Sequence, residues 1–258
     1  VTTISFIFGL LIATALSFVV GANFSQAAIT SGIYAGFASG IAISCLYAAL
    51  ALGPISIVSP LTAVISAIIP VIFDLATGAK LGPFALVAIG LVLVAVVLVA
   101  FVPGQDFRLP SLRALIYSVG AGLGFAGIFV FLDGAPSDSG LATLIVMRIV
   151  GVALMLAGLT YAFFRYRPKQ FFETEIFGRS LIWLVLLAGS GDVLGNVFFL
   201  VATRAGELAI AAVLTSLYPV GTILLARIVL KERIAKSQSL GIVLAIGACV
   251  LIAIGKPA

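Results

Sequence analysis

The chain has 258 residues, of which 63% are hydrophobic and 9% are charged, whereas soluble domains carry about 25% charged residues. This composition excludes a soluble globular domain and indicates an integral membrane protein. The formal net charge is +5, but the basic residues lie in short loops between apolar runs, where membrane orientation explains them, so we expect no nucleic-acid partner.

We divided the apolar runs at glycine, proline and charge clusters, and the result predicts nine transmembrane helices within this sequence. Most loops are short, so consecutive helices are expected to be antiparallel neighbours in one all-α bundle. The alternating pattern of barrel strands is absent. The predicted helices cover residues 4–21, 32–52, 55–77, 82–102, 112–132, 140–164, 180–202, 207–230 and 237–255.

Residues that support catalysis or metal binding are scarce in this sequence. Histidine is absent, which removes histidine metal sites and Ser-His triads. Cys45 and Cys249 lie in apolar runs far apart in the chain and are interpreted as small packing residues. No nucleotide-binding loop or paired-acid motif occurs. We therefore expect no enzyme, no cofactor and no metal ion.

The second half of the chain repeats the pattern of the first. Residues 53–57 correspond to residues 206–210, and residues 90–93 correspond to 241–244. The second half contains five predicted helices and the first only four, so we expect about 30 residues, one helix and its loop, to precede Val1. Because five spans reverse the direction of the chain, the two copies are predicted to be inverted repeats, as in many secondary transporters. The first repeat would cover 1–102, the linker 103–111 and the second repeat 112–258.

The end of the second repeat contains Leu217-Tyr218-Pro219-Val220 and Lys231-Glu232-Arg233-Ile234. These motifs resemble an EamA-type repeat of the drug/metabolite transporter superfamily. The first half is similar at Ser59-Pro60 and Ile69-Pro70, but it has Ala79-Lys80 where a Glu-Arg pair would fall. The resemblance implies a ten-helix bundle of two inverted five-helix repeats, a central substrate cavity and transport of small metabolites. It rests mainly on Leu217-Tyr218-Pro219-Val220, Leu224-Leu225-Ala226-Arg227, Lys231-Glu232-Arg233-Ile234 and Gln238-Ser239-Leu240-Gly241.

Two charges lie deep within predicted spans. Asp192 is near the middle of the apolar run 181–202, which is about 33 Å long as a helix. Arg148 lies about two turns inside the preceding helix, too deep for easy snorkelling. We expect the two to pair. The pair is either a structural bridge between helices or a functional site, in which Asp192 takes up a proton or Arg148 holds a substrate carboxylate and the pair exchanges partners during the cycle. Asn196, one turn beyond Asp192, would share its cavity.

Prolines beside hydroxyl groups mark two further spans. Pro219 removes a helix hydrogen bond next to the side chains of Thr215, Ser216 and Tyr218. Such a kink exposes backbone carbonyls to a cavity in many transporters. The matching helix of the first half contains Pro60 and Pro70, so all three prolines are predicted hinge positions. Weaker candidates for the cavity wall are Ser44, Tyr47 and Tyr117.

These features predict a secondary transporter, an exporter of small metabolites or drugs, in a bacterial inner membrane. The expected partners are a small-molecule substrate, lipid and a coupling proton, with the protein as a monomer or homodimer. The alternatives are a non-transporting truncated bundle and an intramembrane binding or receptor-like protein. The Lys and Arg count places the C-terminus outside the cell, whereas the family resemblance implies a cytoplasmic C-terminus.

Overall fold

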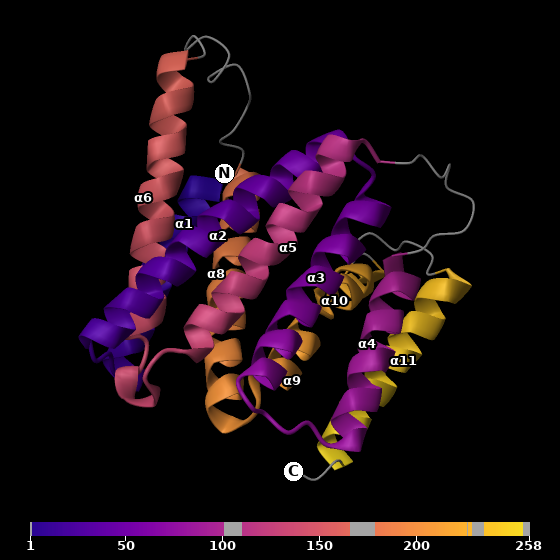
Figure 1. Cartoon of the computed structure of the whole chain (residues 1–258). Coiled ribbons are helices and arrows are strands. Elements are labelled where there is room, and N and C mark those ends of the chain that lie inside the picture. Colours follow the sequence, from indigo (N-terminus) through magenta and orange to yellow (C-terminus); the bar gives the residue numbers. More distant parts are fainter. Residues whose placement is uncertain (1, 101–109, 166–178, 226, 229–234, 255–258) are drawn as a thin grey trace. The chain divides into compact units, whose positions relative to one another are not determined.

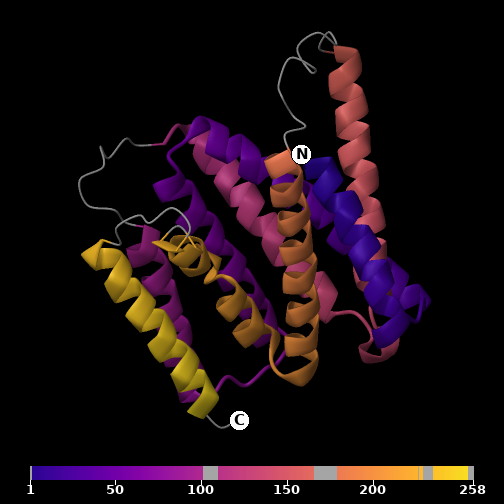
Figure 2. The same ribbon diagram turned by 180° about the vertical axis from the view of Figure 1, so that it is seen from behind.

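The structure is a computed structural model that describes residues 2–100, 110–165, 179–225, 227–228 and 235–254. Within these ranges the chain is almost entirely helical, because a helix satisfies its own backbone hydrogen bonds in an apolar medium. The elements in Figure 1 and, from behind, in Figure 2 are α1 (Thr2–Val20), α2 (Gln26–Leu52), α3 (Ile55–Ala76), α4 (Pro83–Ala100), α5 (Leu112–Asp133), η1 (Ser137–Ser139), α6 (Ala142–Arg165), α8 (Arg179–Ala205), α9 (Leu208–Thr215), α10 (Tyr218–Leu225) and α11 (Lys236–Ile254).

The helix boundaries follow the apolar runs of the sequence. Eight segments of the described chain are long and apolar enough to cross a membrane. The remaining predicted span, residues 82–102, corresponds to a shorter apolar helix, Pro83–Val99. The all-helical fold is thus confirmed over the described residues, while the inverted relation of the two repeats stays a prediction. Most of the predicted linker 103–111 lies outside those residues, as do Lys231, Glu232, Arg233 and Ile234.

The predicted helix 207–230 is interrupted directly before Pro219. Helix α9 ends at Thr215 and α10 begins at Tyr218. Between them the N–H of Leu217 donates to the carbonyl of Leu214 at 3.2 Å, a tighter turn than the α-helix makes. Pro219 has no N–H with which to bond the carbonyl of Thr215, so the interruption coincides with the predicted kink. Helix α3, in contrast, continues through Pro60 and Pro70.

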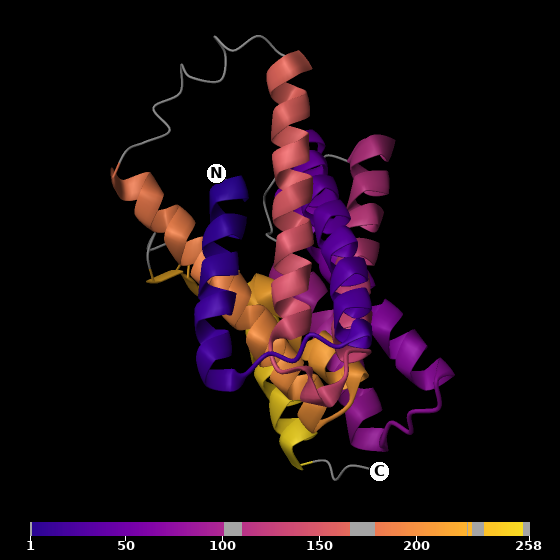
Figure 3. The same ribbon diagram turned by 90° about the vertical axis from the view of Figure 1, so that its left-hand side faces the viewer.

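The chain divides into two compact units, neither of which coincides with one predicted repeat. Unit 1 contains Val1–Gly40 and Phe131–Arg204. In this unit α1 packs along α6 (Figure 3). Helix α2 also approaches α6 closely, because its glycines meet apolar side chains there: a Cβ on Gly36 would lie 2.5 Å from that of Val150. Small residues permit such close helix packing in membranes.

Unit 2 contains Ile41–Val130 and Ala205–Ala258. Its core joins α3, α4, α9 and α11, and α4 and α11 lie side by side in both Figure 1 and Figure 2. The buried contacts involve mainly alanine and valine, including Ala63, Val92, Val213 and Ala248. Short side chains bring the helix backbones near one another, so dispersion contacts stabilise the unit where lipid offers no hydrophobic driving force.

Candidate functional site

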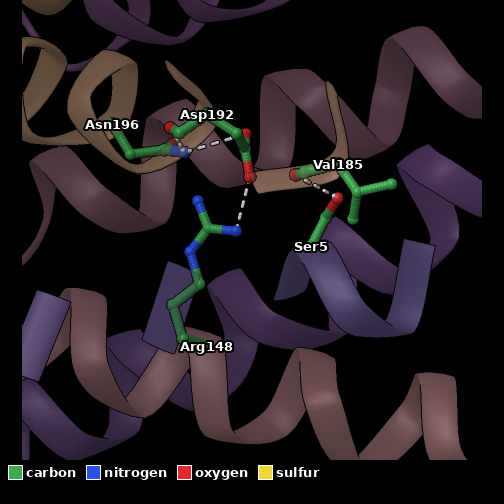
Figure 4. A network of polar contacts seen from close by, with 5 residues as sticks. All are labelled: Ser5, Arg148, Val185, Asp192 and Asn196. Atoms are coloured by element: carbon green, nitrogen blue, oxygen red, sulfur yellow. Dashed lines mark hydrogen bonds and ion pairs between the residues drawn. The ribbon is translucent and has the colours of Figure 1, made fainter. Parts of the chain in front are cut away.

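Arg148 is the most deeply placed charge of the described residues in unit 1. It lies in the first half of α6, which holds the buried residues of that helix, and only 2% of its side chain is exposed. Its Nη1 donates a hydrogen bond to Oδ2 of Asp192 on α8 at 2.5 Å (Figure 4). The Phe6 ring of α1 lies 5.4 Å from the guanidinium carbon and adds a cation–π contact. The pairing expected from the sequence is therefore present.

Asp192 differs from its partner in exposure, because 51% of its side chain is accessible. The amide Nδ2 of Asn196 donates to the backbone carbonyl of Asp192 at 2.8 Å and to its Oδ1 at 3.4 Å. Figure 4 shows the amide and the guanidinium reaching different oxygens of this carboxylate. The three candidates Arg148, Asp192 and Asn196 thus form one connected polar group.

The remaining nitrogens of Arg148 lack such contacts. Both Nε and Nη2 are buried and have no hydrogen-bond partner among the described residues. A buried donor left unpaired costs about 1–3 kcal/mol, and more when the group is charged. Structural ion pairs usually satisfy these donors, whereas this pair leaves two of them unpaired within the described residues.

The glycines around Asp192 lie in two different environments. A Cβ on Gly189 would lie 2.7 Å from the backbone oxygen of Ser5, so this glycine allows α1 and α8 to approach closely. The Ser5 hydroxyl donates to the carbonyl of Val185 at 3.1 Å and joins the same two helices (Figure 4). Gly191 and Gly195, however, have no neighbouring atom within 4 Å of a built Cβ. Packing explains the first glycine only, and the other two border an open surface beside Asp192.

The other predicted site residues lie in unit 2. The hydroxyls of Thr215 and Ser216 donate to carbonyls of their own helix turn, at 2.7 Å to Ala211 and 2.6 Å to Val213. Tyr218, at the start of α10, donates its hydroxyl to the carbonyl of Ser59 on α3 at 3.1 Å. These contacts supply hydrogen bonds around the helix interruption, and they connect it to the proline-containing helix α3.

The weaker candidates are accessible side chains of the same unit. Ser44 and Tyr47 are exposed on α2, and Tyr117 is exposed on α5. Pro60 and Pro70 are buried within α3. Among the described residues, no group of three or more Cys, Asp or Glu side chains is placed to hold a metal ion. The roles predicted for all these residues stay predictions.

Comparison with known proteins identifies the family. Residues 112–254 match the sequence profile of the EamA-like transporter family. The chain belongs to the EamA-like transporter family. A solved structure titled only "Crystal structure of protein" shares its fold with a TM-score of 0.76 at 16% identity, over 98% of this chain and 87% of the other. No curated protein sequence matches the chain.

Membership in the EamA-like family confirms the family resemblance seen in the sequence. It also agrees with the apolar helices, so the chain is a multi-pass membrane protein of a transporter family. Families of this kind carry solutes and are not enzymatic in general. The match covers the whole second predicted repeat up to Ile254, including α6 and α8 with the Arg148–Asp192 pair.

Sequence reasoning missed two polar clusters of this EamA-like protein. In unit 1, Arg204 donates to the Ser139 hydroxyl and the Gly140 carbonyl, both at 2.9 Å. A short antiparallel bridge joins Ala22 to Gly140. These contacts connect three segments: the loop after α1, the loop before α6 and the end of α8. The sequence contained one signal for this cluster: Arg204 and Asp138 carry opposite charges, and both lie near the predicted ends of helices.

The second missed cluster lies in unit 2. The carboxylate of Asp74, on the last turn of α3, accepts the N–H of Ala209 at 2.9 Å. This interaction satisfies one of the unpaired N–H groups at the start of α9 and places negative charge at the positive end of that helix. Burial, and then the nearby charge of Asp74, raise the pKa of Glu207, which precedes α9. Glu207 corresponds to Pro54 in the first repeat, so the repeat pattern does not predict a charge at this position.

Proposed function

We propose that this EamA-like protein is a secondary transporter that exports small metabolites or drugs by alternating access. Its location would be a bacterial inner membrane, and its two five-helix repeats would be inverted relative to each other. In this proposal Arg148, Asp192 and Asn196 contact the substrate or the coupling proton. The helix interruption at Ser216 and Leu217 would allow α9 and α10 to move separately.

The observation that carries this proposal is the buried Arg148 with two unpaired donors. Ionisable groups inside membrane spans are costly and usually mark the pathway of a substrate or ion. Arg148 is 2% exposed and has one carboxylate partner, Asp192, which is itself half exposed. A pair whose carboxylate is accessible can exchange partners, because a proton can reach that carboxylate and weaken its contact with the guanidinium.

The test is transport by cells that express the wild-type protein, Asp192→Asn or the matched control Ser190→Ala. The Ser190 hydroxyl only donates to the Leu186 carbonyl of its own helix at 2.8 Å. We expect wild-type protein and the control to enrich the same metabolites in the medium. Asp192→Asn should insert equally well but lose this enrichment or its dependence on external pH.

Other outcomes would favour the alternatives. Unchanged enrichment with Asp192→Asn would remove Asp192 from the mechanism. A medium that does not change with the wild-type protein, while purified protein still binds a metabolite, would indicate an intramembrane binding or receptor-like protein. Absence of both flux and binding would indicate a non-transporting bundle.

A further inference from the structure

We propose that the solute held by Arg148 is an anion with a planar carboxylate-like edge, and that it binds together with one proton on Asp192. This inference rests on the proposed function of the same site. It adds two properties, the charge of the solute and the linkage between its binding and protonation.

The chemistry of the solute follows from the geometry of the guanidinium. Its Nε–H and one Nη2–H point in the same direction along one edge, and this edge matches the two oxygens of a carboxylate. In unit 1 Asp192 contacts Nη1 only, while Nε and Nη2 are buried without a partner among the described residues. A carboxylate solute would therefore gain two parallel hydrogen bonds, whereas Asp192 makes one.

Charge balance connects the anion to a proton. Arg148 is the cation that contacts Asp192, and α1, which packs against α6 and α8 beside the pair, has no ionisable side chain. A solute anion added to the ionised pair would leave one net negative charge in an apolar region, which is costly. Protonation of Asp192 removes that excess. The anion and the proton should accordingly favour each other's binding.

The remaining ionisable side chains of the described part of unit 1 lie on other helices or toward helix ends. Those whose side chains the structure describes are Tyr34 on α2, Asp133 at the end of α5, Asp138 in η1, Tyr161 and Arg165 near the end of α6, and Arg204 at the end of α8. Asp138 and Arg204 belong to the loop cluster around Ser139. None of these supplies a second cation to the Nη1 contact of Asp192.

Asn196 allows Asp192 to exist in both protonation states. Its amide N–H donates to the ionised carboxylate at 3.4 Å, and its amide oxygen can accept the O–H of the neutral acid after a rotation. Gly191 and Gly195 leave the neighbouring surface open, so a proton and a small anion can approach from the side of Asp192.

The experiment measures binding of acetate and benzoate, with acetamide and benzamide as neutral counterparts, to the purified full chain. The single tryptophan, Trp183 on α8, reports binding by fluorescence, and a pH indicator in weakly buffered solution reports proton uptake. We expect at least one of the two acids to bind, its affinity to rise about tenfold for each pH unit of acidification, and one proton to be taken up per anion. The amides should not bind comparably.

Two variants separate the steps. Asp192→Asn imitates the protonated acid, so it should bind the carboxylate at every pH with no proton uptake. Arg148→Lys keeps the charge but loses the two-donor edge. It should bind the carboxylate at least about tenfold more weakly, because one or more charge-assisted hydrogen bonds are lost. Equal affinity of Arg148→Lys and wild type, pH-independent binding to wild type, or equal binding of acid and amide would each overturn the inference.

The result is distinguishable from failure of the proposed function. If the cells enrich a neutral or cationic metabolite in the medium and neither acid binds, the protein is a transporter and the anion inference is wrong. If the cells enrich nothing and an acid still binds with proton uptake, the site is upheld and transport is refuted.

Discussion

Arg148 and Asp192 form one ion pair, but the side chain of Arg148 is buried and that of Asp192 is half exposed. This difference in exposure predicts that removing either partner changes the free energy of unfolding by a different amount. Asp192→Leu leaves a guanidinium that is 2% exposed without a counter-ion, which should lower the free energy of unfolding by about 3–5 kcal/mol. Arg148→Met leaves a carboxylate that is 51% exposed, so the loss should be about 1 kcal/mol. Denaturant unfolding in detergent, followed by Trp183 fluorescence, measures both.

The double variant is the control for this comparison. With both charges removed, neither unpaired charge remains, so the double variant should be more stable than Asp192→Leu alone. Equal losses in the two single variants would contradict the unequal burial of the pair.

Glu207 makes stability depend on pH in a defined direction. Burial and Asp74 raise its pKa in the folded protein above the ordinary value of 4.5. The folded protein therefore holds this proton more tightly than the unfolded chain, and the resulting stabilisation is present at low pH and lost as pH rises through the folded-state pKa. Glu207→Gln should have a higher melting temperature than wild type at neutral pH.

The difference between Glu207→Gln and wild type should shrink as the solution is acidified. Glu207→Asp keeps a carboxyl group at this position and is the matched control, which should retain the pH dependence. A constant difference between Glu207→Gln and wild type at all pH values would be inconsistent with a raised pKa of Glu207.

The pairing of Arg148 with Asp192 was predictable from the sequence because charges are rare there, and two deep charges on consecutive spans have few other partners. The unequal exposure of the pair was not predictable. It depends on how each helix is rotated, and apolar residues surround these spans on every side. For the same reason the exposed positions of Ser44, Tyr47 and Tyr117 became known only from the structure.

At the scale of the element, two glycines of α8 provide a matched pair. A Cβ at Gly189 would be 2.7 Å from the backbone oxygen of Ser5, whereas one at Gly191 would meet no atom within 4 Å. Gly189→Ala should therefore separate α1 from α8 and cost about 1–3 kcal/mol. Gly191→Ala should be neutral or stabilising by up to about 1 kcal/mol, because alanine favours helix.

Thermal unfolding of the two alanine variants in the same detergent checks this prediction. The Gly191→Ala variant controls for the general effect of removing a glycine from the helix. Similar destabilisation by both substitutions would show that the close approach of α1 and α8 does not depend on Gly189.

The helices were easier to predict than their interruptions. Long apolar runs specify spans because unpaired backbone groups are costly in lipid, and the predicted ends agree closely with α1, α3, α5 and α11. Proline alone did not determine where a helix breaks: α3 continues through Pro60 and Pro70, whereas the chain turns before Pro219. At the latter position Ser216 donates its hydroxyl to the Val213 carbonyl, which offers the backbone an alternative to the regular helix.

At the scale of the whole molecule, the two compact units combine segments from both predicted repeats. Unit 1 takes its charged pair from α6 and α8, whereas unit 2 contains the interrupted helix and α3. Sequence similarity between repeats cannot predict this division, because helices that correspond in sequence need not pack against each other. A transporter with this division would place its buried charge in one unit and its helix interruption in the other.

The direction of the chain through the membrane is testable at the two ends of α5. Ser111 precedes this helix beside Arg113, and Ser137 follows it on the side of Arg204. The cluster of Lys and Arg residues on the Ser111 side predicts that this side is cytoplasmic. In a Cys45→Ser, Cys249→Ala background, a membrane-impermeant maleimide should label Ser137→Cys on intact bacterial cells. It should label Ser111→Cys only after the membrane is opened.

Both serines are exposed, so a difference in labelling reports the side of the membrane and not burial. The reverse pattern would place the C-terminus in the cytoplasm, as the family resemblance implies, and would show that the basic residues do not determine the orientation. Labelling of both positions on intact cells would mean that α5 does not cross the membrane.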